Sequence, residues 1–289
     1  MSNLPLRHLA ILSETPELAM PELNRVSAAL QTQVLRDVAP LWECHATVNA
    51  FSALADVPLG AWPVIIRNDI HQTGAAGIHS DNNGQPFALV QYTPHWSLTA
   101  SHEVIEMLCD PSGNRIKSGK SPMPEQGEVA FLVEVCDPSE AYEFGYAIHG
   151  IAVSDFYTPH YFDPVHSPGV RYSFTGAINK PLDVLPGGYL SWHDPVSDHW
   201  HQETYFDEKR NFRDLGRIDQ QSSNIRSFIY RETAAAAAPA RQGRLAELRM
   251  QAGDGNPAQL ASTAKARTLR TQIDALLRQG MVEPSSRRT

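Results

Sequence analysis

The chain has 289 residues, of which 42% are hydrophobic and 19% are charged, and this composition is typical of a globular protein. Its formal net charge of −8 argues against nucleic-acid partners, and no apolar run approaches the roughly 18 residues of a membrane helix. Three cysteines are too few for a disulfide framework and no signal peptide is recognisable, so we expect a cytoplasmic protein.

The first ninety residues predict one helix followed by strands. Apolar residues recur at close to helical spacing over residues 16–36, which predicts an amphipathic helix. Residues 41–48 and 62–68 are β-branched and apolar enough to predict two strands. Residues 74–92 contain Asn-Asn-Gly between two extended runs, and this turn signal predicts a β-hairpin.

A helix is predicted over residues 97–109, where it ends before Asp-Pro. Residues 112–128 are rich in Gly, Ser, Lys and Pro and predict a loop. The following run, 129–138, is apolar apart from Glu134 and Asp137. Burying two carboxylates there is costly unless they are paired or bound to a metal.

The remainder of the chain has two characters. The irregular, aromatic stretch that follows predicts short strands and long loops. Residues 233–289 hold nine of the 24 basic residues but four of the 32 acidic ones, and they begin with an alanine run. We expect one domain over residues 1–232, with 233–289 forming a linker and a helical or disordered tail able to bind a protein partner.

The central motif is His102-Glu103-Val104-Ile105-Glu106. His102 and Glu106 are four residues apart and share one helix face, as two metal ligands must. The spacing matches the H-E-x-x-H zinc motif, with a carboxylate as the second ligand and Glu103 as general base. Glu134 can supply the third ligand, and Asp137 can orient His102 or exchange roles with Glu134.

This order of helix, strands, edge hairpin and His-Glu-x-x helix resembles the zincin metallopeptidases over roughly residues 15–165. The resemblance implies an α+β fold, in which a small mixed sheet with an edge hairpin packs on the active-site helix, followed by a loop-rich region and the helical tail. Glu134 resembles the third ligand of the gluzincin branch, where this Glu and a following Asp lie on one helix. The segments 101–111, 132–138 and 153–156 also resemble a group of uncharacterised bacterial and phage proteins.

The resemblance implies a metal-dependent peptidase, with Zn²⁺ as the expected divalent ion and a peptide or protein as substrate. Water on the metal would attack the peptide carbonyl while Glu103 accepts its proton. The edge strand would pair with extended substrate at Ala76–His79. Gluzincins use Tyr or His as oxyanion donors, so Tyr157 and His160 are candidates, with aromatic core packing as the other interpretation of each. Glu106 stands where the family has His, which makes a harder site that favours other metals.

Three alternatives remain open. A zincin-shaped protein without catalysis, related to phage or assembly proteins, would use the same carboxylates structurally. His79 and Asp81 match half of a non-haem iron site of an oxygenase. His199, His201 and Glu203 match one face of a cupin-like strand, although a solvated loop explains them as well.

Overall fold

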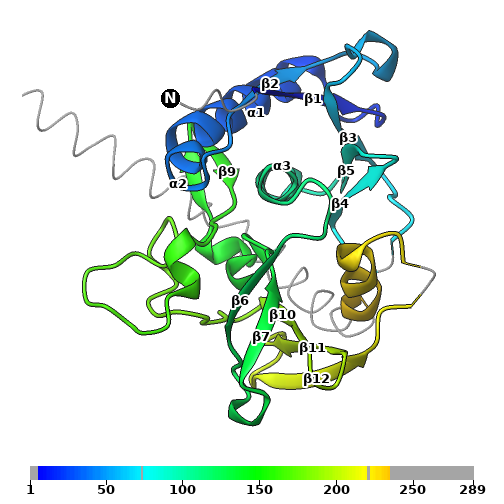
Figure 1. Ribbon diagram of the computed structural model, residues 1–289. Coiled ribbons are helices and arrows are strands. Elements are labelled where there is room, and N and C mark those ends of the chain that lie inside the picture. The colour runs from blue at the N-terminus through cyan, green and yellow to red at the C-terminus, as the bar shows by residue number, and fades with distance from the viewer. Residues whose placement is uncertain (1–5, 73, 220–221, 235–289) are drawn as a thin grey trace, which may run out of the picture.

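The computed structural model describes residues 6–72, 74–219 and 222–234, and it confirms the α+β class. Two five-stranded sheets lie on either side of a central helix, α3 (Trp96–Cys109), as Figure 1 shows. Within the described residues, no helix is both long and apolar enough to cross a membrane.

The first sheet is mixed and has an antiparallel edge strand. Its strand order is β2-β1-β3-β5-β4. The neighbours β1, β2, β3 and β5 pair in parallel, whereas β4 pairs antiparallel with β5 in the predicted hairpin. The strands are β1 (Arg7–Ser13), β2 (Ala46–Ala50), β3 (Trp62–Arg67), β4 (Gly77–Asn82) and β5 (Gln85–Gln91).

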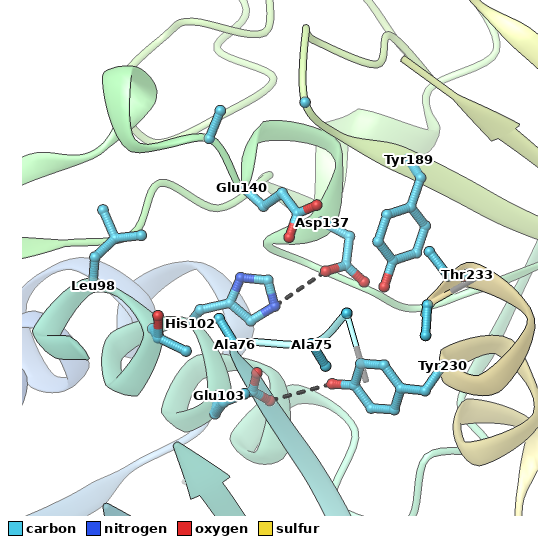
Figure 2. Close-up of a pocket in the computed structure, with 16 residues that line it drawn as sticks. Ala75, Ala76, Leu98, His102, Glu103, Asp137, Glu140, Tyr189, Tyr230 and Thr233 are labelled. Atoms are coloured by element: carbon cyan, nitrogen blue, oxygen red, sulfur yellow. Dashed lines mark hydrogen bonds and ion pairs between the residues drawn. The ribbon is translucent and has the colours of Figure 1, made fainter. Parts of the chain in front are cut away.

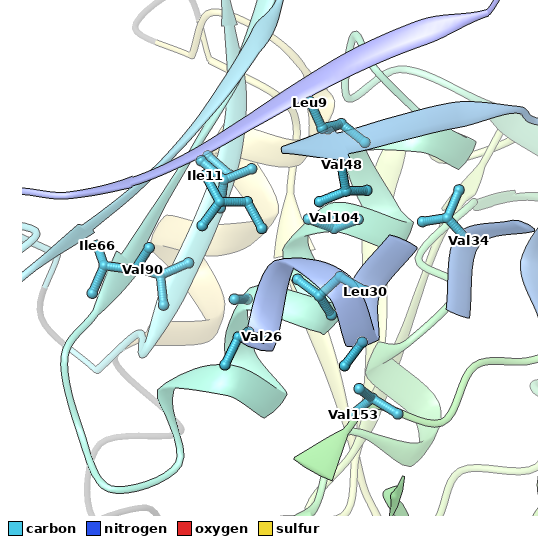
Figure 3. Packing of buried hydrophobic residues seen from close by; sticks show 14 of the residues in the cluster. Leu9, Ile11, Val26, Leu30, Val34, Val48, Ile66, Val90, Val104 and Val153 are labelled. Atoms are coloured by element: carbon cyan, nitrogen blue, oxygen red, sulfur yellow. The ribbon is translucent and has the colours of Figure 1, made fainter. Parts of the chain in front are cut away.

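Helices α1 (Met20–Gln33) and α3 cover one face of this sheet. Helix α1 continues as a π-helical turn, Val34–Val38, and a short helix, α2 (Ala39–Trp42). Leu30 of α1 and Val104 of α3 are fully buried in the same apolar cluster as Ile11 of β1 (Figure 3). Burial of each such side chain stabilises the fold by about 1.5–3 kcal/mol.

The second sheet is antiparallel and follows the central helix. Its order is β12-β11-β10-β7-β6. The strands are β6 (Ile116–Lys120), β7 (Glu128–Leu132), β10 (Tyr189–Asp194), β11 (His199–Thr204) and β12 (Asn211–Gly216). A two-stranded ribbon of β8 (Tyr146–Ile148) and β9 (Ile151–Val153) lies between β7 and β10 in sequence.

Buried hydrogen bonds fix α3 against its surroundings. The Ser101 hydroxyl donates to Gln33 Oε1 over 2.7 Å and accepts the backbone N–H of Ser154 over 2.8 Å. Gln33 in turn donates to the carbonyl of Ser154. The three residues are buried, so this network ties α1, α3 and the segment after β9 into one arrangement.

Residues 225–234 form a helix that bridges both halves of the molecule. Asn224 Oδ1 accepts the backbone N–H of Ser227, and Ser227 Oγ accepts that of Asn224, a reciprocal cap that begins the helix. The N–H of Arg226 donates to the carbonyl of Gly113 after α3. At the other end, Gln202 of β11 donates to Thr233.

Several sequence predictions need correction. The strand expected over 41–48 lies at Ala46–Ala50, because Ala39–Trp42 is helical and Glu43 ends this helix in a left-handed conformation with φ 54°. The loop expected over 112–128 contains β6. Glu134 and Asp137 do not share a helix: Glu134 follows β7, and Asp137 begins a 3₁₀ turn.

Only residues 233 and 234 of the predicted tail, 233–289, belong to the described part of the chain. Residues 233 and 234 continue the helix of 225–232. The rest of the predicted tail, 235–289, lies outside the described residues.

Candidate functional site

Helix α3 places the motif in the interior. The helix is apolar on most of its circumference, so both sheets and their connections bury it, and twelve of its 14 residues are buried. His102, Glu103 and Glu106 are 7%, 2% and 0% exposed. A histidine and two carboxylates held this far from water need partners of opposite charge or a metal ion.

A pocket of about 180 Å³ opens onto this helix. Figure 2 shows His102 and Glu103 on one side, Asp137, Glu140 and Tyr189 opposite them, and Tyr230 and Thr233 of helix 225–234 at the edge. The apolar part of the wall comes from the chain before and within β4, from α3 and from Ala141: Gly74, Ala75, Ala76, Gly77, Leu98 and Ala141.

The ligand atoms of His102, Asp137 and Glu140 lie close enough together to hold one metal ion. One ligand atom from each lies within 4.8 Å of the others, and His102 Nε2 is 3.1 Å from Asp137 Oδ1. An imidazole nitrogen and carboxylate oxygens beside a pocket are ligand types that divalent metal ions accept. The residues present therefore fit a divalent ion. Glu140 takes the ligand position for which the sequence predicted Glu106 or Glu134.

Glu106 and Glu134 have a different partner. The guanidinium of Arg226 pairs with Glu106, lies 2.8 Å from Glu134 Oε1 and lies 2.9 Å from Asp137 Oδ2. Glu106 also accepts the backbone N–H of Cys136 over 2.9 Å. The four predicted ligands His102, Glu106, Glu134 and Asp137 thus do converge, but three of them surround an arginine.

Glu103 belongs to a second chain of contacts along the pocket wall. Arg226 Nη2 donates to the Tyr230 hydroxyl over 2.9 Å, and this hydroxyl donates to Glu103 Oε2 over 3.2 Å. Nδ1 of the buried His79 lies 3.4 Å from the same oxygen. Gly77 faces the other oxygen, because a Cβ at that position would stand 2.6 Å from Glu103 Oε1.

Burial and the excess of acids shift the pKa values of the cluster. Burial raises the pKa of Glu106 to about 8 and that of Glu134 well above its usual range, although Arg226 opposes both shifts. Burial also disfavours the charged form of His102, but the carboxylates of Glu106 and Asp137 outweigh it and raise the His102 pKa to about 10. Despite burial, Arg226 and His102 hold the pKa of Asp137 below its usual range.

Tyr157 and His160, the predicted oxyanion donors, do not line this pocket in the described structure. Tyr157 is fully buried and stacks on Tyr161 with ring centroids 4.3 Å apart, in the aromatic core. His160 is on the surface, where it pairs with Asp163 over 2.9 Å. The aromatic-core interpretation therefore describes Tyr157.

The rival clusters have other partners. Asp81 accepts the backbone N–H of Gly84 in the hairpin turn and lies 3.4 Å from Asn224 Nδ2, while His79 faces Glu103. The described residues contain no group of metal-ligating side chains that joins His79 to Asp81. His199, His201 and Glu203 do lie on β11, but His199 pairs with Asp214 and Glu203 with Arg210.

The sequence interpretation missed Glu140, Tyr189, Arg226 and Tyr230. A signal was present for the last two: they lie four apart, on the same face as Ile229 and Thr233, and such a face is buried in an amphipathic helix. An arginine on a buried face needs acidic partners, and Glu106, Glu134 and Asp137 were already identified.

Comparisons with protein-family models, with curated proteins and with solved structures found no match for this chain.

Proposed function

We propose that this protein is a metal-dependent hydrolase that acts on peptide bonds from the pocket on α3. His102, Asp137 and Glu140 would hold one divalent ion, with Zn²⁺ as the expected ion because it accepts an imidazole nitrogen beside carboxylate oxygens. Such an ion would acidify water and polarise a substrate carbonyl. The observation that carries the proposal is that Glu103, a carboxylate, lines the same pocket as this ligand group.

The residues around Glu103 support its role as general base. Tyr230 donates to Oε2 and so fixes the carboxylate, which leaves Oε1 on the Gly77 side to accept a proton and return it to the leaving amine. The Tyr230 hydroxyl accepts a hydrogen bond from Arg226, and this contact orients the one proton that it donates to Glu103. Leu98 and the small residues before β4 keep this space apolar.

The position of β4 supports a peptide as the substrate. Among the described residues this strand lies at the edge of its sheet, and Gly77, its first residue, lines the pocket. An extended peptide can add to such an edge through backbone hydrogen bonds. Its scissile bond would then lie beside Glu103.

The test combines metal analysis with hydrolysis of a fluorescently labelled protein. The wild type should bind one Zn²⁺ per chain and cleave the substrate. Glu103→Gln should keep the ion and lose at least about a hundredfold in rate, because it removes the proton acceptor. His102→Ala should lose both the ion and the activity.

His199→Ala is the matched control, because His199 also pairs with an aspartate but lies on β11, outside the residues that line the pocket. It should keep metal and activity. A wild-type protein that binds no divalent ion, or a Glu103→Gln variant with full activity, would contradict the proposal.

A second candidate is a non-catalytic binding protein of the same shape. The observation that favours it is Arg226, a buried cation that pairs with Glu106, Glu134 and Asp137. Under this function, His102→Ala and Glu103→Gln would both retain binding to the partner. Metal analysis of the wild type separates the two candidates.

A further inference from the structure

Arg226 is a deeply buried cation beside the pocket. Its side chain is 1% exposed; its Nη2 contacts Glu106, and its Nη1 contacts both Glu134 and Asp137. The Tyr230 ring packs over it, with the guanidinium carbon 4.4 Å from the ring centroid. Gly113 allows the close approach of this helix, since a Cβ there would stand 2.7 Å from Arg226 Cβ.

A divalent ion and this guanidinium would use the same oxygens. Arginine offers five N–H donors in a planar fork that stays charged, so one side chain can satisfy several carboxylates. Without it, the oxygen atoms of Glu106, Glu134 and Asp137 would form a cluster of hard ligands. Such clusters bind Ca²⁺ or Mn²⁺ in preference to softer ions.

We propose that Arg226 is a resident cation that withholds Glu106 and Glu134 from metal binding. It thereby confines a divalent ion to His102, Asp137 and Glu140. The site then prefers an ion that accepts the imidazole nitrogen of His102 as a ligand. This inference rests on the metal centre of the proposed function. Arg226 acts through the carboxylates, so it is a positioning residue.

The test is the metal preference of Arg226→Met, which keeps much of the length of the side chain without its charge. Calorimetric titrations with Ca²⁺ and with Zn²⁺ should show Ca²⁺ affinity at least about tenfold higher than in the wild type, because carboxylate number tunes Ca²⁺ binding. The matched control is Arg210→Met, since Arg210 also bridges two carboxylates, Asp183 and Glu203, outside the pocket lining. This control should leave both titrations unchanged.

Unchanged Ca²⁺ affinity in a folded Arg226→Met protein would overturn the inference. If this variant is unfolded in chelator, added Ca²⁺ should restore its circular dichroism, whereas failure to do so would equally count against the inference. Arg226→Lys serves as the second variant: a point charge cannot bridge three carboxylates, so it should gain Ca²⁺ affinity to a smaller extent. An Arg226→Lys protein that titrates identically to the wild type would contradict the need for the fork.

The two proposals fail separately. If the wild type binds no ion but Arg226→Met binds Ca²⁺, the hydrolase proposal is lost, and of the role of Arg226 only the withholding of Glu106 and Glu134 from metal stands. If the wild type binds Zn²⁺ through His102 and Arg226→Met shows the same metal preference, the metal centre stands and the role of Arg226 is lost.

Discussion

The substitution Gly77→Ala tests whether the space beside Glu103 is required. Gly77 begins the edge strand β4, and an added Cβ would stand 2.6 Å from Glu103 Oε1, 2.9 Å from Glu103 Cγ and 2.7 Å from Thr99 Cγ2. Carbon atoms do not approach this closely without a shift. Because Tyr230 donates to Oε2 of Glu103 and His79 lies beside that oxygen, the carboxylate must give way at Oε1, the oxygen that faces Gly77.

The expected cost follows from this crowding. Overpacking by one methyl group in a packed interior destabilises a fold by about 1–3 kcal/mol. A displacement of roughly 1 Å in a catalytic group lowers the rate by about a hundredfold. The three atoms nearest to this Cβ belong to Glu103 and Thr99 and not to the ligand group His102, Asp137 and Glu140, so the metal content should stay at the wild-type level.

Urea unfolding, metal analysis and hydrolysis of the labelled protein measure the three effects. Gly119→Ala is the matched control, because Gly119 also lies on an edge strand, β6, where its Cβ would meet only the ring edge of Phe131 at 3.2 Å. The control should keep full activity. A Gly77→Ala protein with wild-type activity would refute the placement of Glu103 as the general base.

Two further predictions concern stability. Because burial raises the pKa of Glu106 from 4.5 to about 8, the native state holds a proton that the unfolded chain releases, so the unfolding free energy should fall as pH rises from about 5 to about 8. Urea titrations across this range check it, and Glu106→Gln should flatten the profile; an equal slope in that variant would contradict the assignment. Ser101→Ala should cost about 1–3 kcal/mol in the same assay, because it removes the donor to Gln33 Oε1 and the acceptor of the Ser154 N–H in a buried place. A loss below about 0.5 kcal/mol would mean that this network does not hold α3 in place.

Local signals predicted the elements that carry the motif. The helix was recognisable because its apolar run stops at Asp110-Pro111, and the hairpin because Asn-Asn-Gly favours a tight turn. Strand β6 was not predicted, because Ile116–Lys120 is mostly polar, is exposed at a sheet edge and shows no alternation of apolar and polar residues. Strand β1, Arg7–Ser13, was not among the predicted elements.

The sequence predicted the acidic residues and the histidine of the site but not the arginine that pairs with the acids. The i,i+4 spacing identifies His102 and Glu106, and the cost of burying Glu134 and Asp137 gives reason to bring them in. No local rule connects these residues to Arg226, because the contact depends on how a distant helix docks. The identity of the cation between the carboxylates is therefore a tertiary property.

Helix 225–234 has a consequence for the order in which the chain acquires its structure. During synthesis, α3 and its carboxylates precede Arg226 by on the order of ten seconds. In that interval the first sheet can form, but a native arrangement of Glu106 and Glu134 around α3 would have no counter-charge. The N-terminal half should therefore stay loosely packed, with Glu106 and Glu134 protonated or bound to a cation from solution, until helix 225–234 has been synthesised and Arg226 can pair with them.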